Sequence, residues 1–229
     1  MALMTDTSEA MRTNQWFSAL PAEERETLIR RSEALTLHPG EYLFHRGDAP
    51  TGFYGILSGR LKAFTVREDG KEAILSVIEA GNWFGQTSLT SGQPRPRDVV
   101  ALDRATLLVV RAAAFEELMQ STAFVRAIAE LQSLHMNWLY RMVEDATLHS
   151  TRARIARRLL LVASGDATLS PLCRLDVSLS QDTLAMMLGI TRQTLSLELK
   201  AMAEKGAIAL RYGRIEILSK DLLASFQDD

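Results

Sequence analysis

Short apolar runs separated by glycine-bearing turns fill the first half of the chain. The runs cover residues 41–45, 52–57, 61–66 and 73–78. The turns around them carry Gly40, Gly47, Gly59, Gly70 and Gly81. Parallel strands need a long crossover between them, and no helix-length segment separates these runs. The pattern therefore predicts an antiparallel β-roll or jelly roll.

Residues 122–150 contain neither glycine nor proline, which predicts one long helix of roughly 40 Å at about 1.5 Å per residue. Apolar positions along it alternate by four and three, as in a coiled-coil seam. The predicted dimer seam consists of Phe124, Ile128, Leu131, His135, Trp138 and Met142. Packing of this stripe against the chain's own β-roll is the alternative, because such stripes often face a core.

Residues 178–205 show the pattern of two short capped helices separated by a glycine turn. Ser180 is placed to cap the first helix, Gly189 to end it, and Thr191 to cap the second. The apolar positions predicted to share one buried face are Leu184, Met187, Leu188, Leu195, Leu199 and Met202. This is the layout of a helix-turn-helix, although a helical hairpin used only for packing has the same local signals.

A predicted β-hairpin follows the two helices and strengthens the DNA-binding interpretation. Residues 208–217 alternate around a Tyr-Gly turn, which indicates a wing. Arg and Gln near a helix N-terminus can contact bases in a major groove, while Ser and Lys can hold phosphates. The expected DNA-binding residues are Ser180, Thr191, Arg192, Gln193, Ser196, Lys200, Arg211 and Arg214.

Charge and composition support a two-part organisation. Residues 150–220 hold 11 Lys and Arg against 6 Asp and Glu, a net charge of +5, whereas residues 1–149 hold 15 against 19, or −4. Apolar content is 47%, and the longest wholly apolar runs are about five residues, too short to span a membrane. No secretory signal is visible at the N-terminus, so we expect a cytoplasmic protein. The single cysteine, Cys173, excludes an intrachain disulfide and a cluster held by several cysteines.

These observations predict an α+β chain of three segments. Residues 1–121 form the β-roll sensor domain with N-terminal helices, residues 122–150 the dimerisation helix, and residues 151–229 the winged helix-turn-helix. This order resembles the cyclic-AMP receptor protein and FNR superfamily of bacterial transcription regulators (CRP/FNR). The most specific matching pieces are residues 45–62, the run Trp83-Phe-Gly-Gln-Thr-Ser-Leu89, and the run Thr191-Arg-Gln-Thr-Leu-Ser196.

The resemblance implies a ligand-binding cassette that begins near residue 83. A glycine-led turn into a short helix directs backbone N–H groups at an anion, and a following arginine supplies a fixed charge. The positions that the resemblance assigns to the ligand are Gly85, Gln86, Thr87, Ser88, Arg95, Arg97, Leu139 and Tyr140. The partners it implies are double-stranded DNA, a second copy of the chain, RNA polymerase and a small anionic effector.

The sequence departs from the family members that bind cyclic AMP. Gln86 replaces a glutamate, Pro96 follows Arg95 where a hydroxyl residue is expected, and Leu139 and Tyr140 replace small hydroxyl residues on the long helix. Cyclic AMP is therefore not the expected effector. A different anion or nucleotide held by Arg95 and Arg97, a vestigial pocket, and a signal of another kind all remain open, as does constitutive DNA binding.

Metal cofactors are not expected either. The oxygen-sensing iron-sulfur branch of the superfamily needs several cysteines, and a haem group would need a histidine ligand. The four histidines are His38, His45, His135 and His149. A lone histidine on a strand or helix is usually structural.

Two other functions compete with DNA binding as interpretations of this sequence. A nucleotide-binding module that controls a protein partner would not need the winged segment. Nothing favours an enzyme, since Ser88 lacks a Gly-x-Ser-x-Gly elbow and the histidines have no metal-ligand spacing.

The recognition helix also departs from the best-known family pattern, because Gln193 replaces a glutamate and Leu197 an arginine. Residues 165–174 are the expected loop for contact with RNA polymerase.

Overall fold

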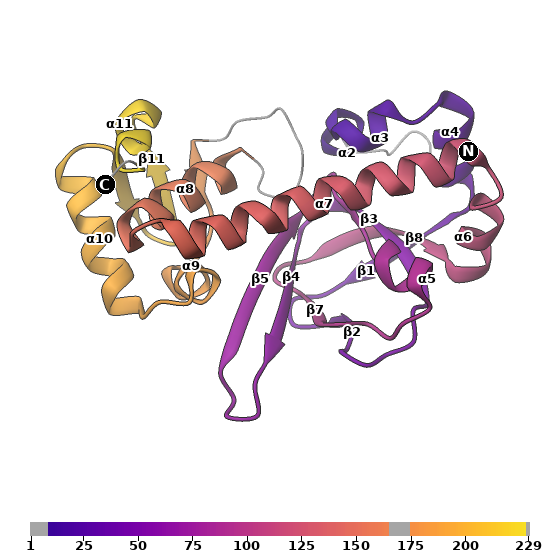
Figure 1. Ribbon diagram of the computed structural model, residues 1–229, viewed down its shortest axis with the longest axis horizontal. Helices are drawn as coiled ribbons and strands as arrows, with labels where there is room; N and C mark the ends of the chain where they lie inside the picture. Colours follow the sequence, from indigo (N-terminus) through magenta and orange to yellow (C-terminus); the bar gives the residue numbers. More distant parts are fainter. Residues whose placement is uncertain (1–8, 165–174, 228–229) are drawn as a thin grey trace. The chain divides into compact units, whose positions relative to one another are not determined.

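The computed structural model describes residues 9–164 and 175–227 (Figure 1). These residues form two compact units. The first contains residues 9–65 and 75–136, and the second contains residues 66–74, 137–164 and 175–227. The predicted polymerase-contact loop, residues 165–174, lies outside the described residues.

The first unit is a β-roll of two four-stranded sheets, as predicted. The first sheet has the order β1 (Ser32–Leu37), β8 (Ala105–Arg111), β3 (Gly52–Ser58), β6 (Trp83–Phe84). The second has the order β2 (Tyr42–Phe44), β7 (Asp98–Ala101), β4 (Arg60–Val66), β5 (Glu72–Glu79). The recorded strand pairings are antiparallel, and the four apolar runs recognised in the sequence became β2 to β5.

One turn between these strands shows why glycine is needed. Gly59, between β3 and β4, has φ of +80°, and a Cβ atom there would lie 2.4 Å from the carbonyl oxygen of Arg104. A side chain at this position would therefore clash with backbone as well as strain the turn.

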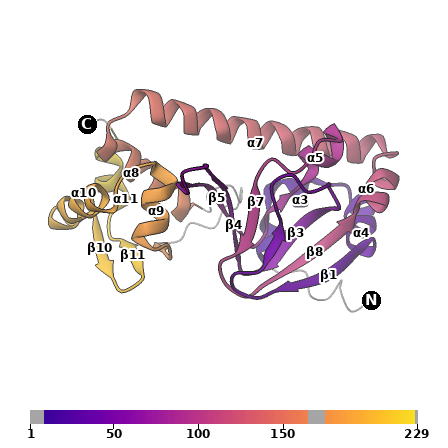
Figure 2. The same cartoon turned by 90° about the horizontal axis from the view of Figure 1, so that it is seen from below.

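Short helices accompany the strands of the β-roll, and Figure 2 labels four of them. These short helices are α2 (Glu9–Thr13), α3 (Gln15–Ala19), α4 (Ala22–Arg30), α5 (Gln86–Ser91) and α6 (Ala112–Leu118). An aromatic cluster joins them to the sheet, with Phe53 stacked 5.0 Å from Trp83 and Phe17 stacked 5.8 Å from the same ring. The indole N–H of Trp16 donates to the carbonyl oxygen of Ala127 at 2.6 Å. This buried bond fastens α3 to the long helix α7 (Thr122–Leu148).

Half of the predicted dimer seam on α7 is buried within the protein's own chain, and the other half is partly exposed. Phe124, Ile128 and Leu131 are buried in the core of the first unit. His135 bonds to Gln86, and Trp138 and Met142 contact Arg158. The alternative, packing within the chain, is therefore correct for Phe124, Ile128 and Leu131.

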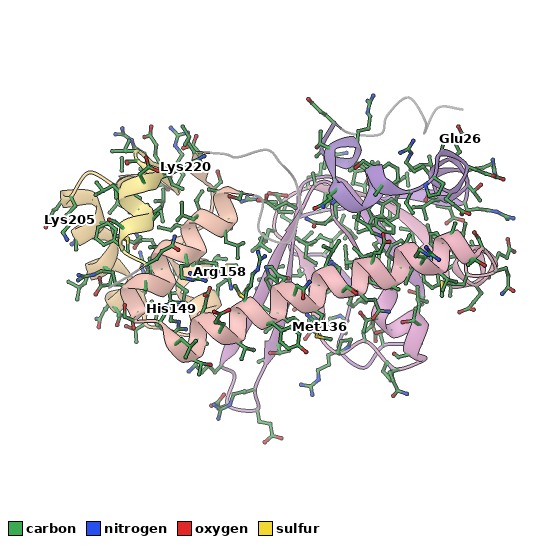
Figure 3. The ribbon with its side chains drawn as sticks, turned by 45° about the horizontal axis from the view of Figure 1, so that its top comes forward. Glu26, Met136, His149, Arg158, Lys205 and Lys220 are labelled. Carbon is green, nitrogen blue, oxygen red and sulfur yellow. The ribbon has the colours of Figure 1, made fainter. Side chains whose placement is uncertain are left out.

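A second stripe with the same spacing lies one residue further along α7. We call it the exposed stripe, and it consists of Val125, Ala129, Gln132, Met136, Leu139 and Val143. Five of these residues are exposed and Gln132 is partly buried, and Figure 3 labels Met136 on this helix. The four-three repeat alone does not say which of two neighbouring stripes faces inward.

The second unit contains the remaining helices and a small sheet. They are α8 (Thr151–Ala163), β9 (Asp176–Val177), α9 (Gln181–Leu188), α10 (Arg192–Glu204), β10 (Ile208–Arg211), β11 (Arg214–Ile217) and α11 (Lys220–Ser225). The sheet order is β10-β11-β9, so a short third strand, which the sequence did not predict, extends the wing hairpin.

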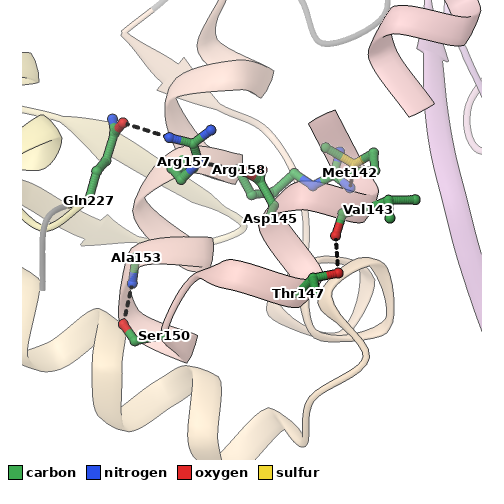
Figure 4. A network of polar contacts seen from close by, with 9 residues as sticks. All are labelled: Met142, Val143, Asp145, Thr147, Ser150, Ala153, Arg157, Arg158 and Gln227. Carbon is green, nitrogen blue, oxygen red and sulfur yellow. Dashed lines mark hydrogen bonds and ion pairs between the residues drawn. The ribbon is translucent and has the colours of Figure 1, made fainter. Parts of the chain in front are cut away.

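A polar network joins the end of α7 to α8 (Figure 4). The Ser150 hydroxyl caps α8 by accepting the Ala153 N–H at 3.2 Å. Arg157 donates to the Asp145 carboxylate at 2.6 Å and to the Gln227 side chain at 3.3 Å. The guanidinium of Arg158 is buried beside the Met142 sulfur at 2.7 Å. These contacts hold the C-terminal end of α7 within the helix-turn-helix unit.

Candidate DNA-binding surface and effector site

The two helices of the helix-turn-helix begin and end where the sequence predicted. The Ser180 hydroxyl accepts the Thr183 N–H at 3.0 Å, and the Thr191 hydroxyl accepts the Thr194 N–H at 3.1 Å. Gly189 ends α9 with φ of +67°, in the left-handed region. Ser180 and Thr191 therefore act first as N-caps, and their place at the helix starts keeps them near any anion that approaches these termini.

The buried face of the two helices matches the prediction except at Met187. Leu184, Leu188, Leu195, Leu199 and Met202 are buried as expected. Met187 is partly exposed, and Ala185 is buried instead. The buried arc of α9 is centred between Leu184, Ala185 and Leu188, which places position 187 about 100° away at its edge.

The outer face of α10 presents Arg192, Gln193 and Lys200 to solvent, with Ser196 partly exposed. The Arg192 guanidinium lies 3.5 Å from the Asp182 carboxylate of α9, an ion pair that sequence reasoning missed. Both side chains are largely exposed, and such pairs contribute about 1 kcal/mol or less. Arg192 can therefore exchange Asp182 for a base or a phosphate at small cost.

The wing has the predicted hairpin form. β10 and β11 pair with Arg211 opposite Arg214, and Gly213 at the turn has φ of +70°. Arg211 lies 3.1 Å from Glu216, and Arg214 lies 3.9 Å from Asp176, both as exposed ion pairs. Tyr212 at the tip is fully exposed, which the sequence analysis did not single out. Two arginines and an aromatic ring at one tip suit contact with a nucleic-acid backbone.

The position of α10 is set by contacts within its own unit. Arg152 of α8 donates to the Glu198 carboxylate at 2.7 Å, on the side of α10 away from the exposed arginine. With Leu195, Leu199 and Met202 buried, α10 is fixed along one side and exposed along the other. A helix of this kind fits a major groove, which is about 12 Å wide.

The candidate effector site lies in the first unit at the start of α5. Gly85 has φ of +98°, and a Cβ atom there would lie 3.0 Å from the Tyr54 ring and 3.1 Å from the Gly52 carbonyl oxygen. The next residue, Gln86, is buried, and its amide nitrogen lies 3.0 Å from Nδ1 of His135 on α7. Its side-chain oxygen is buried with no hydrogen-bond partner among the described residues. α5 and α7 are therefore joined through a buried amide and an imidazole.

Arg95 donates hydrogen bonds to the protein's own backbone. It is 2% exposed, and its two amino groups donate to the carbonyl oxygens of Gly85 at 2.9 Å and Gly52 at 2.6 Å. The guanidinium also lies over the Phe44 ring at 4.4 Å. Burial lowers the pKa of Arg95 from its usual value, with Tyr54 and Asp48 acting in the opposite direction. Its Nε is buried without a partner among the described residues, so an acceptor is still lacking at this atom.

The other predicted ligand positions differ in burial and in the unit to which they belong. The buried Ser88 hydroxyl donates to the Pro94 carbonyl oxygen at 3.4 Å, and Thr87 is exposed. Arg97 is partly buried and close enough to His135 to affect its pKa. Leu139 and Tyr140 are exposed residues that belong to the second unit.

We expect His135 to make the stability of the protein pH-dependent. Burial, and then the charge of Arg97, lower the pKa of His135 to about 4. The unfolded chain, with a histidine pKa near 6.5, therefore binds more protons than the folded chain between these values. Stability should fall as the pH decreases through this window, by about 2 kcal/mol between roughly pH 7 and pH 4.5.

Urea unfolding at several pH values would measure this loss. The variant His135→Gln keeps an amide partner for Gln86 and has no proton to gain, so its stability should change less across the same range. Parallel curves for the wild type and the variant would contradict the prediction.

The described residues contain neither a cluster of metal-ligating side chains nor a helix that could cross a membrane. Within residues 9–164 and 175–227, no three His, Cys, Asp or Glu side chains gather as a metal ion would require. His45, one of the four histidines considered, has Nδ1 3.2 Å from an Asp98 carboxylate oxygen. No helix in the same ranges has the length and apolar character needed to cross a membrane.

Comparison with known proteins assigns both halves of the chain. Residues 34–122 match the family model of the cyclic nucleotide-binding domain, and residues 153–226 match the Crp-like helix-turn-helix domain. The Cyclic AMP receptor protein of Thermus thermophilus is 26% identical over 215 residues, which is 93% of this chain and 96% of that protein. The nitrogen fixation regulation protein FixK of Bradyrhizobium diazoefficiens is 28% identical over 218 residues, 91% of this chain and 88% of that one.

A solved structure shows the same fold. FixK2 from Bradyrhizobium japonicum superimposes with a TM-score of 0.76 at 16% identity, covering 85% of this chain and 96% of that one. Fold, recognition surface and domain matches together define a DNA-binding transcription regulator with a domain of the cyclic nucleotide-binding type. The chain belongs to the CRP/FNR family of transcription regulators. A regulator, and not an enzyme, was expected from the sequence.

Proposed function

We propose that the protein acts as a homodimer whose two copies of α10 enter successive major grooves of a pseudo-palindromic operator, about 34 Å apart. The observation that carries the proposal is the outer face of α10. It combines exposed Arg192, Gln193 and Lys200 on a helix whose opposite face is buried. The basic excess of residues 150–220 supports attraction to phosphates.

The exposed stripe of α7 supports the homodimer. Its apolar residues Val125, Met136, Leu139 and Val143 repeat at the spacing that lets two helices pack against each other. An isologous interface uses the same patch on both copies, and a stripe along one helix meets this condition. Dimerisation then places two recognition helices on one DNA duplex.

We propose further that cyclic AMP is not the effector, although the domain is of the cyclic nucleotide-binding type. Arg95 would have to leave the carbonyl oxygens of Gly85 and Gly52 before it could hold a phosphate with its amino groups. Gln86 is engaged with His135, and Pro96 has no N–H or hydroxyl to offer. Another anion bound with Arg97, a vestigial pocket and constitutive DNA binding remain as alternatives. Activity on DNA fits the cytoplasmic location expected from the sequence.

Selection from a randomised duplex pool tests this function. Purified protein would be incubated with the pool at moderate salt, with and without cyclic AMP, and the retained DNA sequenced. Enrichment of one palindrome in both conditions is the expected result. Enrichment only with cyclic AMP would overturn the effector proposal, and no enrichment in either condition would overturn the operator-binding proposal.

Arg192→Ala should relax the preference for one base pair in each half-site. Arg192 is exposed near the start of α10, where a guanidinium can donate to guanine O6 and N7. Loss of one such contact costs about 1 to 3 kcal/mol per half-site. The measurement is the affinity of the variant for the selected operator and for its single-base substitutions. Equal weakening on every sequence would instead identify Arg192 as a phosphate contact.

A further inference from the structure

Leu197 is a large apolar side chain held in solvent on the recognition helix. It is 69% exposed, whereas Leu195 and Leu199 on the same helix are fully buried. The buried face of α10 is therefore complete without it, since position 197 lies about 200° around the helix from each of them. Single exposed leucines are common on protein surfaces. This one is set apart by its position among residues that suit DNA contact.

Gln193 and Leu197 share one face of α10. Residues four apart lie about 40° apart around the axis and about 6 Å apart along it. Base pairs stack about 3.4 Å apart, so a helix lying along a major groove brings these side chains to base pairs about two steps apart. Ser196 and Lys200 flank Leu197 on the same outer surface.

The two side chains select different groups on the bases. The Gln193 amide can donate to N7 and accept from the N6 amino group of adenine at the same time. Leu197 has no donor or acceptor, and would leave the polar edge of most bases without a partner. The 5-methyl group of thymine is the apolar group that a major groove presents.

We infer that Leu197 is a specificity-determining residue that contacts the 5-methyl group of an operator thymine, about two base pairs from an adenine contacted by Gln193. The inference rests on the proposed function and adds the chemistry of one operator position. It predicts that the thymine is selected for its methyl group and not for its hydrogen-bonding edge.

Replacing thymine by deoxyuridine removes this methyl group and leaves base pairing unchanged. Each thymine of the selected half-site would be replaced singly, and the affinity of the full-length protein measured at fixed salt. One replacement should weaken binding by the wild type about fourfold per half-site, the effect of losing one buried methyl group. Leu197→Ala should bind the thymine operator more weakly and should not distinguish thymine from deoxyuridine at that position.

Two variants serve as controls. Leu197→Met keeps an apolar side chain of similar volume and should keep the discrimination. Leu218→Ala removes another exposed leucine of the same unit, outside α10, and should leave the discrimination between thymine and deoxyuridine unchanged. Because Leu197 is outside the core, its substitution should not change the melting temperature.

The outcomes separate this inference from the proposed function. The protein could select an operator at which every deoxyuridine replacement affects the wild type and Leu197→Ala equally. This result would overturn the role of Leu197 but not the proposed function. Failure to select any operator would overturn both.

Discussion

Val143→Glu is expected to convert the protein to a monomer and to weaken operator binding by at least about a hundredfold. Val143 is 63% exposed on the exposed stripe of α7. In a symmetric interface each copy would bury a carboxylate without a cation, which costs several kcal/mol per charge. A monomer then loses the second half-site, whose linkage raises affinity by about 10² to 10⁴. Light scattering would give the mass, and operator titration the affinity.

Arg141→Glu is the matched control for Val143→Glu. Arg141 is an exposed residue two positions earlier, about 160° away around α7. It receives the same new side chain on the same helix, and its change should leave the dimer intact. If Val143→Glu remained dimeric with full operator affinity, the exposed stripe could not be the dimer interface.

Arg95→Ala is expected to lower the free energy of unfolding by about 4 kcal/mol. The substitution removes the guanidinium donors of the buried Gly52 carbonyl oxygen and the part-buried Gly85 carbonyl oxygen, and hydrogen bonds from a charged group contribute about 1.5 to 3 kcal/mol each. It also removes the contact with the Phe44 ring. Relief from burying a guanidinium offsets part of this loss. Urea unfolding of the full-length protein, followed by tryptophan fluorescence, would measure the change.

Arg97→Ala is the control for the arginine at position 95. Arg97 lies two residues further along and is only partly buried, so its removal should cost much less. If both variants had similar free energies of unfolding, the hydrogen bonds of Arg95 to the backbone would not stabilise the protein. Such a result would favour a ligand-binding role for Arg95.

The helix-turn-helix was predictable because its signals are local. Ser180, Gly189 and Thr191 each act within three or four residues of their own position, as caps or as a left-handed turn. The wing was equally predictable from alternation around a Tyr-Gly turn. Met187 shows the limit, since a short helix has few positions to fix its buried arc.

The sequence did not determine which of two neighbouring faces of α7 packs against the first unit. Two stripes with the same four-three spacing run side by side, and either could meet a partner. The structure shows that the stripe with Phe124, Ile128 and Leu131 is buried in the first unit, which leaves the neighbouring stripe at Met136 and Val143 outside. That outcome depends on the three-dimensional shape of the β-roll, which cannot be deduced from the local sequence of α7.

The sequence offered candidate residues for an effector site but could not show what those residues contact. The family resemblance had assigned Gly85, Gln86 and Arg95 to this site, and Arg95 does contact Gly85. The partners of Arg95 are backbone carbonyl oxygens, which leave no mark in a sequence. The partner of Gln86 is His135, 49 residues away on another element.

The bond between Gln86 of α5 and His135 of α7 means that a ligand binding at Gln86 would compete with His135 for the same amide nitrogen. A molecule that needs the nitrogen of Gln86 has to displace an imidazole first, so its measured affinity would be lower than the pocket's own contacts suggest. Its binding would also release the His135 side chain on α7, and His135 immediately precedes Met136 of the exposed stripe. Ligand binding in the β-roll would then change the contacts of α7 even if the ligand itself did not touch α7.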